Sequence, residues 1–245
     1  MMKRLVVAFL VSSLALFSSA VSAQESRQGK DNYVGVIAGG VFPGQLDWEE
    51  RFPDRVPLSD VKLENGLILG VKLGHRPNKL ARSSRLDIAV ELEAFAISGT
   101  DVGSEYYYFH PFGSTVDLRT DISIMTLMLN VLLRDPYGQV HPYGGVGMGW
   151  TWFAMEDVKL VMQPGWQWPD MSTNVNRQGD LEDDAFAFQV LLGIGIDLTE
   201  RLSADLGYRY LRTEPEFEFS KGGVDLDTKM TYKTHMITVG LTYAF

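Results

Sequence analysis

Apolar and polar residues alternate with a period of two along most of the chain from Asn32 onward. Such alternation indicates β-strands with one apolar face, whereas a period near 3.6 would indicate helices. The pattern predicts eight strands, at residues 33–42, 65–75, 85–97, 121–134, 140–154, 185–198, 202–212 and 232–245. Each is as long as the roughly 9–11 residues with which a tilted strand crosses a bilayer, or a little longer.

The connections between the predicted strands alternate in length. Those at residues 76–84, 135–139 and 199–201 are short, whereas the other four run to about 20 residues or more. Outer-membrane barrels have short periplasmic turns and longer outer loops in this alternation. The sequence therefore predicts an all-β fold, an eight-stranded antiparallel up-and-down transmembrane β-barrel.

The faces of the predicted strands indicate which side meets lipid. In the third strand the even-numbered residues from Leu86 to Ala94 are apolar, whereas Asp87, Glu91 and Glu93 lie on the opposite face. Because lipid offers no hydrogen bonds to the backbone, strands can span a membrane only as a closed sheet. The apolar face then points outward and the polar face inward. The strands at 33–42 and 121–134 are apolar on both faces and do not show this orientation by themselves.

Aromatic residues occur where several of these strands are expected to cross the headgroup region. Tyr and Trp favour that interface, because part of each ring system is apolar and part can meet water. The predicted aromatic girdle comprises Trp150, Trp152, Tyr208, Tyr210, Tyr243 and Phe245.

The beginning of the chain predicts export. Lys3 and Arg4 precede an apolar run, and small residues follow up to Ala23, which is the pattern of a secretory signal peptide. We expect a signal peptide at 1–23 and a barrel domain at 24–245. Cysteine is absent, so disulfides do not hold the fold together. The net charge of −9 argues against binding nucleic acid through a basic surface.

Three stretches, together with the signal peptide, resemble a known family. These are HPYGGVGMGW at 141–150, RLSADLGYRYL at 201–211 and VGLTYAF at 239–245. They are similar to the small outer-membrane β-barrel family, the opacity and OmpA-like transmembrane domains that are often called porin-like. The resemblance implies a location in the outer membrane of a Gram-negative bacterium, among lipid and lipopolysaccharide. It also implies recognition of the last strand by the outer-membrane assembly machinery, and functions that differ with the loops.

Charged residues on the inward faces form the first candidate site. An eight-stranded barrel is just wide enough for its own side chains, so inward charges must pair or be hydrated. We expect a salt-bridged plug in which Lys72 and Arg209 meet acidic partners; the alternative is a gated, narrow ion path. The candidate residues are Lys72, Asp87, Glu91, Glu93, Arg134, Asp197, Asp205 and Arg209.

Catalysis is not expected from the sequence. Lipid A deacylases among small outer-membrane barrels use a His and a Ser two residues apart on a strand, and none of the four histidines here has Ser at that position. The glycine run at 144–149 does not fit a dinucleotide-binding loop, and we expect it to leave room for long side chains in the lumen. No metal-ligand spacing is convincing, and no cofactor is expected.

Aromatic residues in the long connections form a second candidate site. Tyr106, Tyr107 and Tyr108 lie in one connection, and Trp166 and Trp168 lie in the next. They either form a surface that binds a partner, such as a ligand on a host or another cell, or pack against each other beyond the membrane. The leading function is therefore a structural, surface-interactive and adhesin-like role. The alternatives are a narrow porin-like or OmpW-like channel and a lipid A-modifying enzyme.

Overall fold

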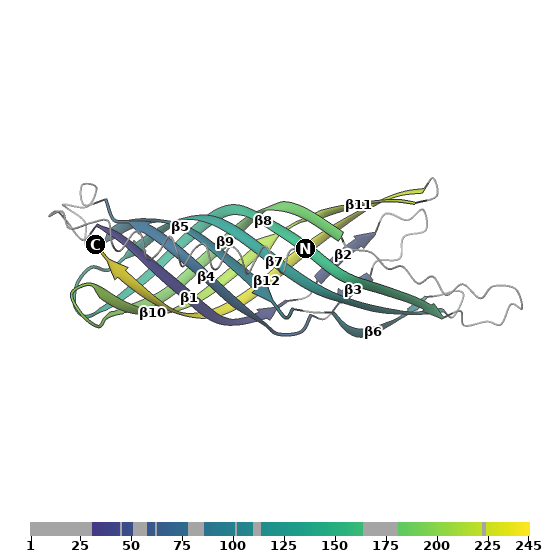
Figure 1. Cartoon of the computed structure of the whole chain (residues 1–245), viewed down its shortest axis with the longest axis horizontal. Helices are drawn as coiled ribbons and strands as arrows, with labels where there is room; N and C mark the ends of the chain where they lie inside the picture. The colour runs from purple at the N-terminus through teal and green to yellow at the C-terminus, as the bar shows by residue number, and fades with distance from the viewer. Residues whose placement is uncertain are drawn as a thin grey trace, which may run out of the picture.

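The chain forms a closed antiparallel β-barrel. The computed structural model describes residues 31–44, 46–50, 58–61, 63–77, 86–100, 102–109, 114–163, 181–221 and 224–245. Its barrel strands pair in chain order, and β1 pairs with β12 to close the sheet (Figure 1). These strands are β1 (Asn32–Pro43), β4 (Gly66–His75), β5 (Asp87–Ser98), β7 (Ser114–Arg134), β8 (Val140–Gln163), β9 (Leu181–Asp197), β10 (Leu202–Thr213) and β12 (Val224–Ala244). The predicted eight-stranded barrel is confirmed.

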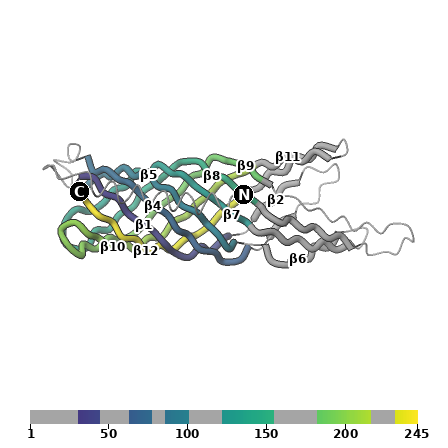
Figure 2. The backbone as a smooth tube through the Cα atoms, in the orientation of Figure 1, coloured from purple at the N-terminus to yellow at the C-terminus, as the bar shows by residue number. Residues whose placement is uncertain are grey.

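The two ends of the barrel differ. One end, which we call the turn end, carries the short β7–β8 and β9–β10 turns and the last residue of β12 (Figure 1). The β7–β8 turn needs Gly138, whose φ of 87° lies in the left-handed region that favours glycine. At the other end, the extension end, β7, β8 and β12 continue well beyond the predicted strand limits (Figure 1). Figure 2 shows β1, β4 and β5 side by side and inclined to the long axis of the barrel.

Four further strands, which the sequence pattern did not predict, lie at the extension end. They are β2 (Leu46–Glu50), β3 (Leu58–Val61), β6 (Val102–Phe109) and β11 (Glu216–Lys221). β11 and β2 pair with the extended part of β12, β3 pairs with β2, and β6 pairs with β7. The long connections are therefore paired in part, and backbone pairing continues beyond the residues in which the alternation predicted strands.

The orientation of the strand faces agrees with the prediction. Leu92, Leu206 and Val239 point outward and are about half exposed, whereas their strand neighbours Glu91, Glu93 and Asp205 are buried in the lumen. The strands that are apolar on both faces are now oriented as well. Ile37 and Met128 point inward, whereas Val36, Leu127 and Leu129 are exposed on the outer face. Among the described residues, no helix is long and apolar enough to cross a membrane.

Candidate functional site

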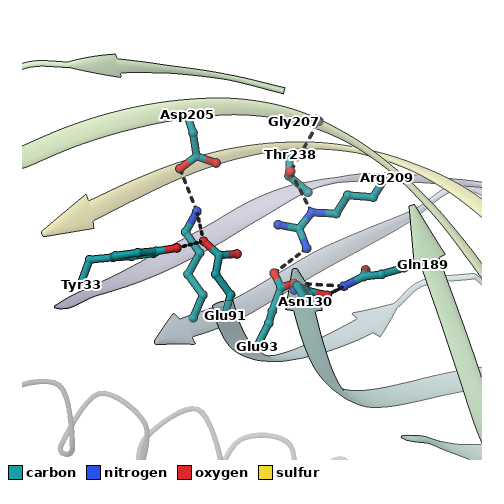
Figure 3. Close-up of polar contacts among 10 residues, drawn as sticks. Tyr33, Glu91, Glu93, Asn130, Gln189, Asp205, Gly207, Arg209 and Thr238 are labelled. Atoms are coloured by element: carbon teal, nitrogen blue, oxygen red, sulfur yellow. Dashed lines mark hydrogen bonds and ion pairs between the residues drawn. The ribbon is translucent and has the colours of Figure 1, made fainter. Parts of the chain in front are cut away.

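Arg209 and Glu93 form the centre of a buried polar network in the lumen (Figure 3). Nη1 of Arg209 donates a hydrogen bond to Oε1 of Glu93, and the two side chains are 2% and 0% exposed. Oε2 of Glu93 accepts hydrogen bonds from Asn130 at 2.9 Å and from Gln189 at 3.3 Å. Nε of Arg209 donates to Thr238 at 3.3 Å. Both charges therefore have a charged partner and further polar partners, which a buried ion pair requires.

A second ion-paired group lies nearer the turn end. Nζ of Lys72 is 3.2 Å from Oδ2 of Asp205 and 3.9 Å from Oε1 of Glu91. The hydroxyl of Tyr33 donates a 2.7 Å hydrogen bond to the same Glu91 oxygen (Figure 3). One ammonium group is thus shared between two carboxylates, and none of these charged side chains is more than 9% exposed.

The remaining candidate charges lie at the rim of the turn end. Arg134 is 3.5 Å from Asp197, which also accepts a hydrogen bond from Ser203 at 2.7 Å and lies 2.7 Å from Nε2 of His141. Asp87 is the register partner of Arg134 on the neighbouring strand. The eight sequence-predicted charges therefore divide into five in the buried lumen and three at its rim.

Beyond the ion pairs, toward the extension end, the lumen is filled by apolar side chains. None of them is more than 2% exposed. We call this cluster the apolar layer: Ile37, Val41, Ile68, Phe95, Ile97, Ile122, Ile124, Met128, Phe153, Ala187, Leu211, Tyr232 and Met236. The rings of Phe153 and Tyr232 pack edge to face at 5.8 Å. Buried threonines, among them Thr126, Thr151 and Thr234, lie on the same inward faces. The ion pairs are therefore on one side of the lumen, and the other side is mostly apolar.

Inward-facing glycines make room for the polar network. A Cβ atom at Gly147 would overlap the amide oxygen of Asn130, and one at Gly193 would overlap the ring of Tyr143. The expected role of the glycine run is confirmed at these positions, because the space of the missing side chains is occupied by larger ones from neighbouring strands.

A cavity of about 50 Å³ opens between the rim and the second ion-paired group. Arg76, Arg134 and Ser203 line it near the turn end, and Lys72 and Asp205 line it deeper in the barrel. The volume exceeds the roughly 10–15 Å³ that one water molecule needs. The lining combines these polar groups with apolar surface from Ala89 and Leu132, so the cavity has room for water beside its charged groups.

The predicted girdle residues lie in two groups, one toward each end of the barrel. Trp150 donates a hydrogen bond to Asp184 and packs edge to face on Phe186, and Trp152 is 38% exposed two residues further along. Tyr208 and Tyr210 both contact the ring of His235. At the turn end, Tyr243 accepts a hydrogen bond from Arg201 at 3.3 Å, and the backbone N–H of Phe245 donates to Asn32.

For the aromatic residues of the second candidate site, the structure describes at most the backbone. Tyr106, Tyr107 and Tyr108 belong to β6, whose backbone pairs with β7. Trp166 and Trp168 lie outside the described residues. Whether these aromatic residues form one surface stays a prediction.

Sequence reasoning missed several polar residues of the lumen. Tyr33, Asn130 and Gln189 all bond to the buried carboxylates. Tyr33 and Asn130 belong to the two strands that are apolar on both faces, and neither side chain carries a charge. The sequence feature that could have indicated Asn130 is that it is the one amide among the inward positions of β7. Among the described residues no group of three or more His, Asp or Glu could hold a metal ion.

The chain is similar to several known proteins. An uncharacterized protein of Brucella abortus is 28% identical over 187 residues, which cover 71% of this chain and 62% of the relative. The chain thus spans less than two thirds of that relative's length. Neisserial surface protein A is 14% identical with a TM-score of 0.48, over 87% of this chain and 97% of the other. OprG of Pseudomonas aeruginosa is 13% identical with a TM-score of 0.49, over 88% and 97%.

A family model matches almost the whole chain. Residues 9–245 match the model described as the outer membrane protein beta-barrel domain. The match agrees with the closed barrel, its outward-facing apolar belt and its short-turn end. In such barrels the short turns face the periplasm and the longer connections face outward. The chain belongs to the outer membrane protein beta-barrel domain family and is a protein of the bacterial outer membrane.

Proposed function

We propose that this protein is a non-conducting structural barrel of the outer membrane whose surface contacts are made by its strand extensions. The apolar layer is the observation that carries this proposal. Its side chains are at most 2% exposed, so an ion crossing the lumen would lose its hydration there. Transfer of an unpaired ion into such surroundings costs several kcal/mol or more. The ion pairs beneath the layer add a second obstacle.

The extension end supports the surface role. β8 has 24 residues, which correspond to about 80 Å of strand at about 3.3 Å per residue. Even with a tilt of about 40°, such a strand is much taller than a hydrocarbon core of about 30 Å. β7 and β12, with 21 residues each, also extend beyond the membrane. In this proposal the extensions present Tyr106–Tyr108, Trp166 and Trp168 to partners outside the cell.

The strand pair β10–β12 supports a contact with outer-leaflet lipid. Its outward-facing register pairs change from Leu206 with Val239 to Tyr210 with His235, and then to Arg212 with Lys233. The last pair places two cationic side chains side by side at the outer border of the apolar belt, where Arg212 is also paired with Glu214 at 2.6 Å in an exposed ion pair. Phosphate groups of lipopolysaccharide occupy that level of the membrane, and cations bind phosphate strongly. We infer that Arg212 and Lys233 contact lipid phosphates.

Attachment assays test the surface role. Cells of an outer-membrane host strain that express the wild-type chain are compared with cells that express a variant with Tyr106, Tyr107, Tyr108, Trp166 and Trp168 replaced by Ser. We expect the wild type to promote autoaggregation or attachment to epithelial monolayers, and the variant to lose this effect. A difference in gel mobility between heated and unheated samples shows that the variant barrel is folded. Wild-type cells that behave like cells without the gene would contradict the proposal.

A further inference from the structure

Both ring nitrogens of His141 face hydrogen-bond acceptors at the turn end. Nδ1 lies 2.9 Å from the backbone carbonyl oxygen of Asp135, and Nε2 lies 2.7 Å from Oδ2 of Asp197. A neutral imidazole has one N–H group and one nitrogen that can only accept, so it can satisfy one of these two contacts at a time. The imidazolium form has two N–H groups and can donate to both acceptors. The geometry therefore favours a protonated His141.

The groups around His141 decide where the proton lies. Asp197 also accepts a hydrogen bond from Ser203 and lies 3.5 Å from Arg134, and both contacts favour its charged form. The proton therefore stays on the imidazole, whose side chain is only 4% exposed. Arg134 opposes the imidazolium with its own positive charge, whereas the Asp197 carboxylate is in direct contact with it. Further charged side chains toward this end of the lumen are Arg76 and Asp87.

The contacts of His141 connect three segments of the chain. His141 lies on β8, Asp197 is the last residue of β9, and Asp135 begins the β7–β8 turn. Within that turn, the N–H of Asp135 donates to the carbonyl of Pro142 at 3.0 Å, and the N–H of Tyr137 donates to the Asp135 carboxylate at 2.9 Å. When His141 loses its proton, its remaining N–H should stay with Asp197, because a charged acceptor binds a donor more strongly than a carbonyl does. The lone pair of Nδ1 then faces the Asp135 carbonyl oxygen, and the turn loses this contact.

We propose that His141 is a pH-sensitive latch, which holds the β7–β8 turn against β9 in its protonated form and releases the turn when it loses its proton. An imidazole changes its charge between about pH 5 and 8. The unfolded chain does not offer His141 these two acceptors. The added stability is therefore present in acid and is lost as the pH rises through that range. Arg134 and Ser203, which share the Asp197 carboxylate, line the cavity, so the latch lies beside it at the periplasmic end of the lumen.

Hydrogen exchange of the refolded barrel in neutral detergent tests the proposal. Exchange of the backbone amides at residues 135–139 is followed by mass spectrometry at about pH 5.5 and about pH 8.5, on either side of the imidazole range. The rates are corrected for the intrinsic pH dependence of amide exchange. We expect about fivefold less protection of this turn at the higher pH, which corresponds to the usual net contribution of one hydrogen bond. The β9–β10 turn at residues 199–201 contains no histidine and is the internal control, so its protection should stay the same.

The His141→Gln variant identifies the latch. Glutamine does not titrate, and we expect the difference in protection between the two pH values to disappear. His75→Gln is the matched control, because His75 is an exposed histidine at the same end of the barrel, 2.7 Å from Asn32, and it should keep the difference. If His141→Gln does not refold, Asp197→Asn provides the second variant. It removes the charge that holds the imidazolium, so the difference should disappear there too.

Three results would overturn the proposal. These are equal protection of the wild-type β7–β8 turn at both pH values, an equal loss of protection in both turns, and a loss that His141→Gln or Asp197→Asn retains. Stronger protection at the higher pH would also overturn it, because the neutral imidazole would then be the form that holds the turn.

Discussion

Arg209 on β10 and Glu93 on β5 pair across the barrel, 116 residues apart in the sequence. β5 and β10 are separated by three strands in either direction around the closed sheet, so the pair spans the full width of the lumen. Arg209 supplies the positive charge that Glu93 needs from the opposite wall. Asn130 and Gln189, on intervening strands, donate further hydrogen bonds to Glu93. The ion pair therefore connects walls of the barrel that share no backbone hydrogen bonds.

Breaking this pair should destabilise the barrel strongly. Arg209→Ala leaves the Glu93 carboxylate buried without its charged partner, and removal of one partner of a buried pair costs about 3–5 kcal/mol. Denaturant unfolding of the protein refolded in phosphate-free, neutral detergent measures the change. The double variant Glu93→Gln with Arg209→Met should recover most of the loss, because it leaves no unpaired charge.

Arg212→Ala is the matched control for that experiment. Arg212 lies three residues further along β10 and pairs with Glu214 at 2.6 Å, but both side chains are exposed. Exposed ion pairs contribute about 0–1 kcal/mol. Similar losses of stability for Arg209→Ala and Arg212→Ala would show that the lumen pair has no special structural role.

Gly147→Ala should destabilise the barrel, whereas Gly195→Ala should not. The new methyl group at position 147 would overlap the Asn130 amide, so the buried network must shift at a cost of about 1–3 kcal/mol. At position 195, also inward-facing, the nearest atom to a new Cβ is 3.8 Å away, which is an ordinary contact. The denaturant midpoints of the two variants provide the comparison, and equal midpoints would mean that the lumen is less tightly packed than described.

Replacement of both Arg212 and Lys233 by Ala should weaken the interaction with phosphorylated lipid A. Binding to vesicles with phosphorylated lipid A is compared with binding to vesicles that contain the dephosphorylated form. The wild type should prefer the phosphorylated form several-fold, and the double variant should lose this preference. Arg201→Ala is the control, because Arg201 lies at the periplasmic end of the same strand pair beside Tyr243. Loss of the preference in Arg201→Ala alone would place the phosphate contact elsewhere.

The strands and their faces could be predicted because they depend on local alternation. Leu86 and Asp87, for example, are assigned to opposite faces by their position alone. Register across the barrel is not local, so the sequence could indicate that Lys72 and Arg209 need acidic partners but not which carboxylate each one meets. The extensions of β7 and β8 were missed because the alternation that lipid imposes ends at the membrane border, near Trp152.

The structure explains why the strands at 33–42 and 121–134 are apolar on both faces. Ile37 on β1 and Ile124 and Met128 on β7 point inward and belong to the apolar layer. The apolar inward faces of these strands therefore indicated a mostly apolar part of the lumen. Tyr33 and Asn130, the uncharged polar residues of the same strands, carry no charge that would have indicated their place in the network.

Removal of the large rings from the apolar layer should open the lumen. A variant with Phe95, Phe153 and Tyr232 replaced by Ala removes three of the largest fully buried side chains and leaves the ion pairs in place. We expect small conductance steps from this variant in a planar bilayer, because water can then enter the outer half of the lumen. If the inserted variant stays silent, the ion pairs rather than the apolar layer close the barrel.

Single-channel recording of the refolded wild-type protein in a planar bilayer tests the central claim most directly. Resistance of the unheated sample to unfolding on a denaturing gel, together with protection from protease in the same lipid, establishes that the barrel is inserted. A sealed lumen predicts no conductance steps at any voltage that the bilayer tolerates. Reproducible steps from the wild type that change with Lys72→Ala or Arg209→Ala would contradict it and would identify the barrel as a narrow channel.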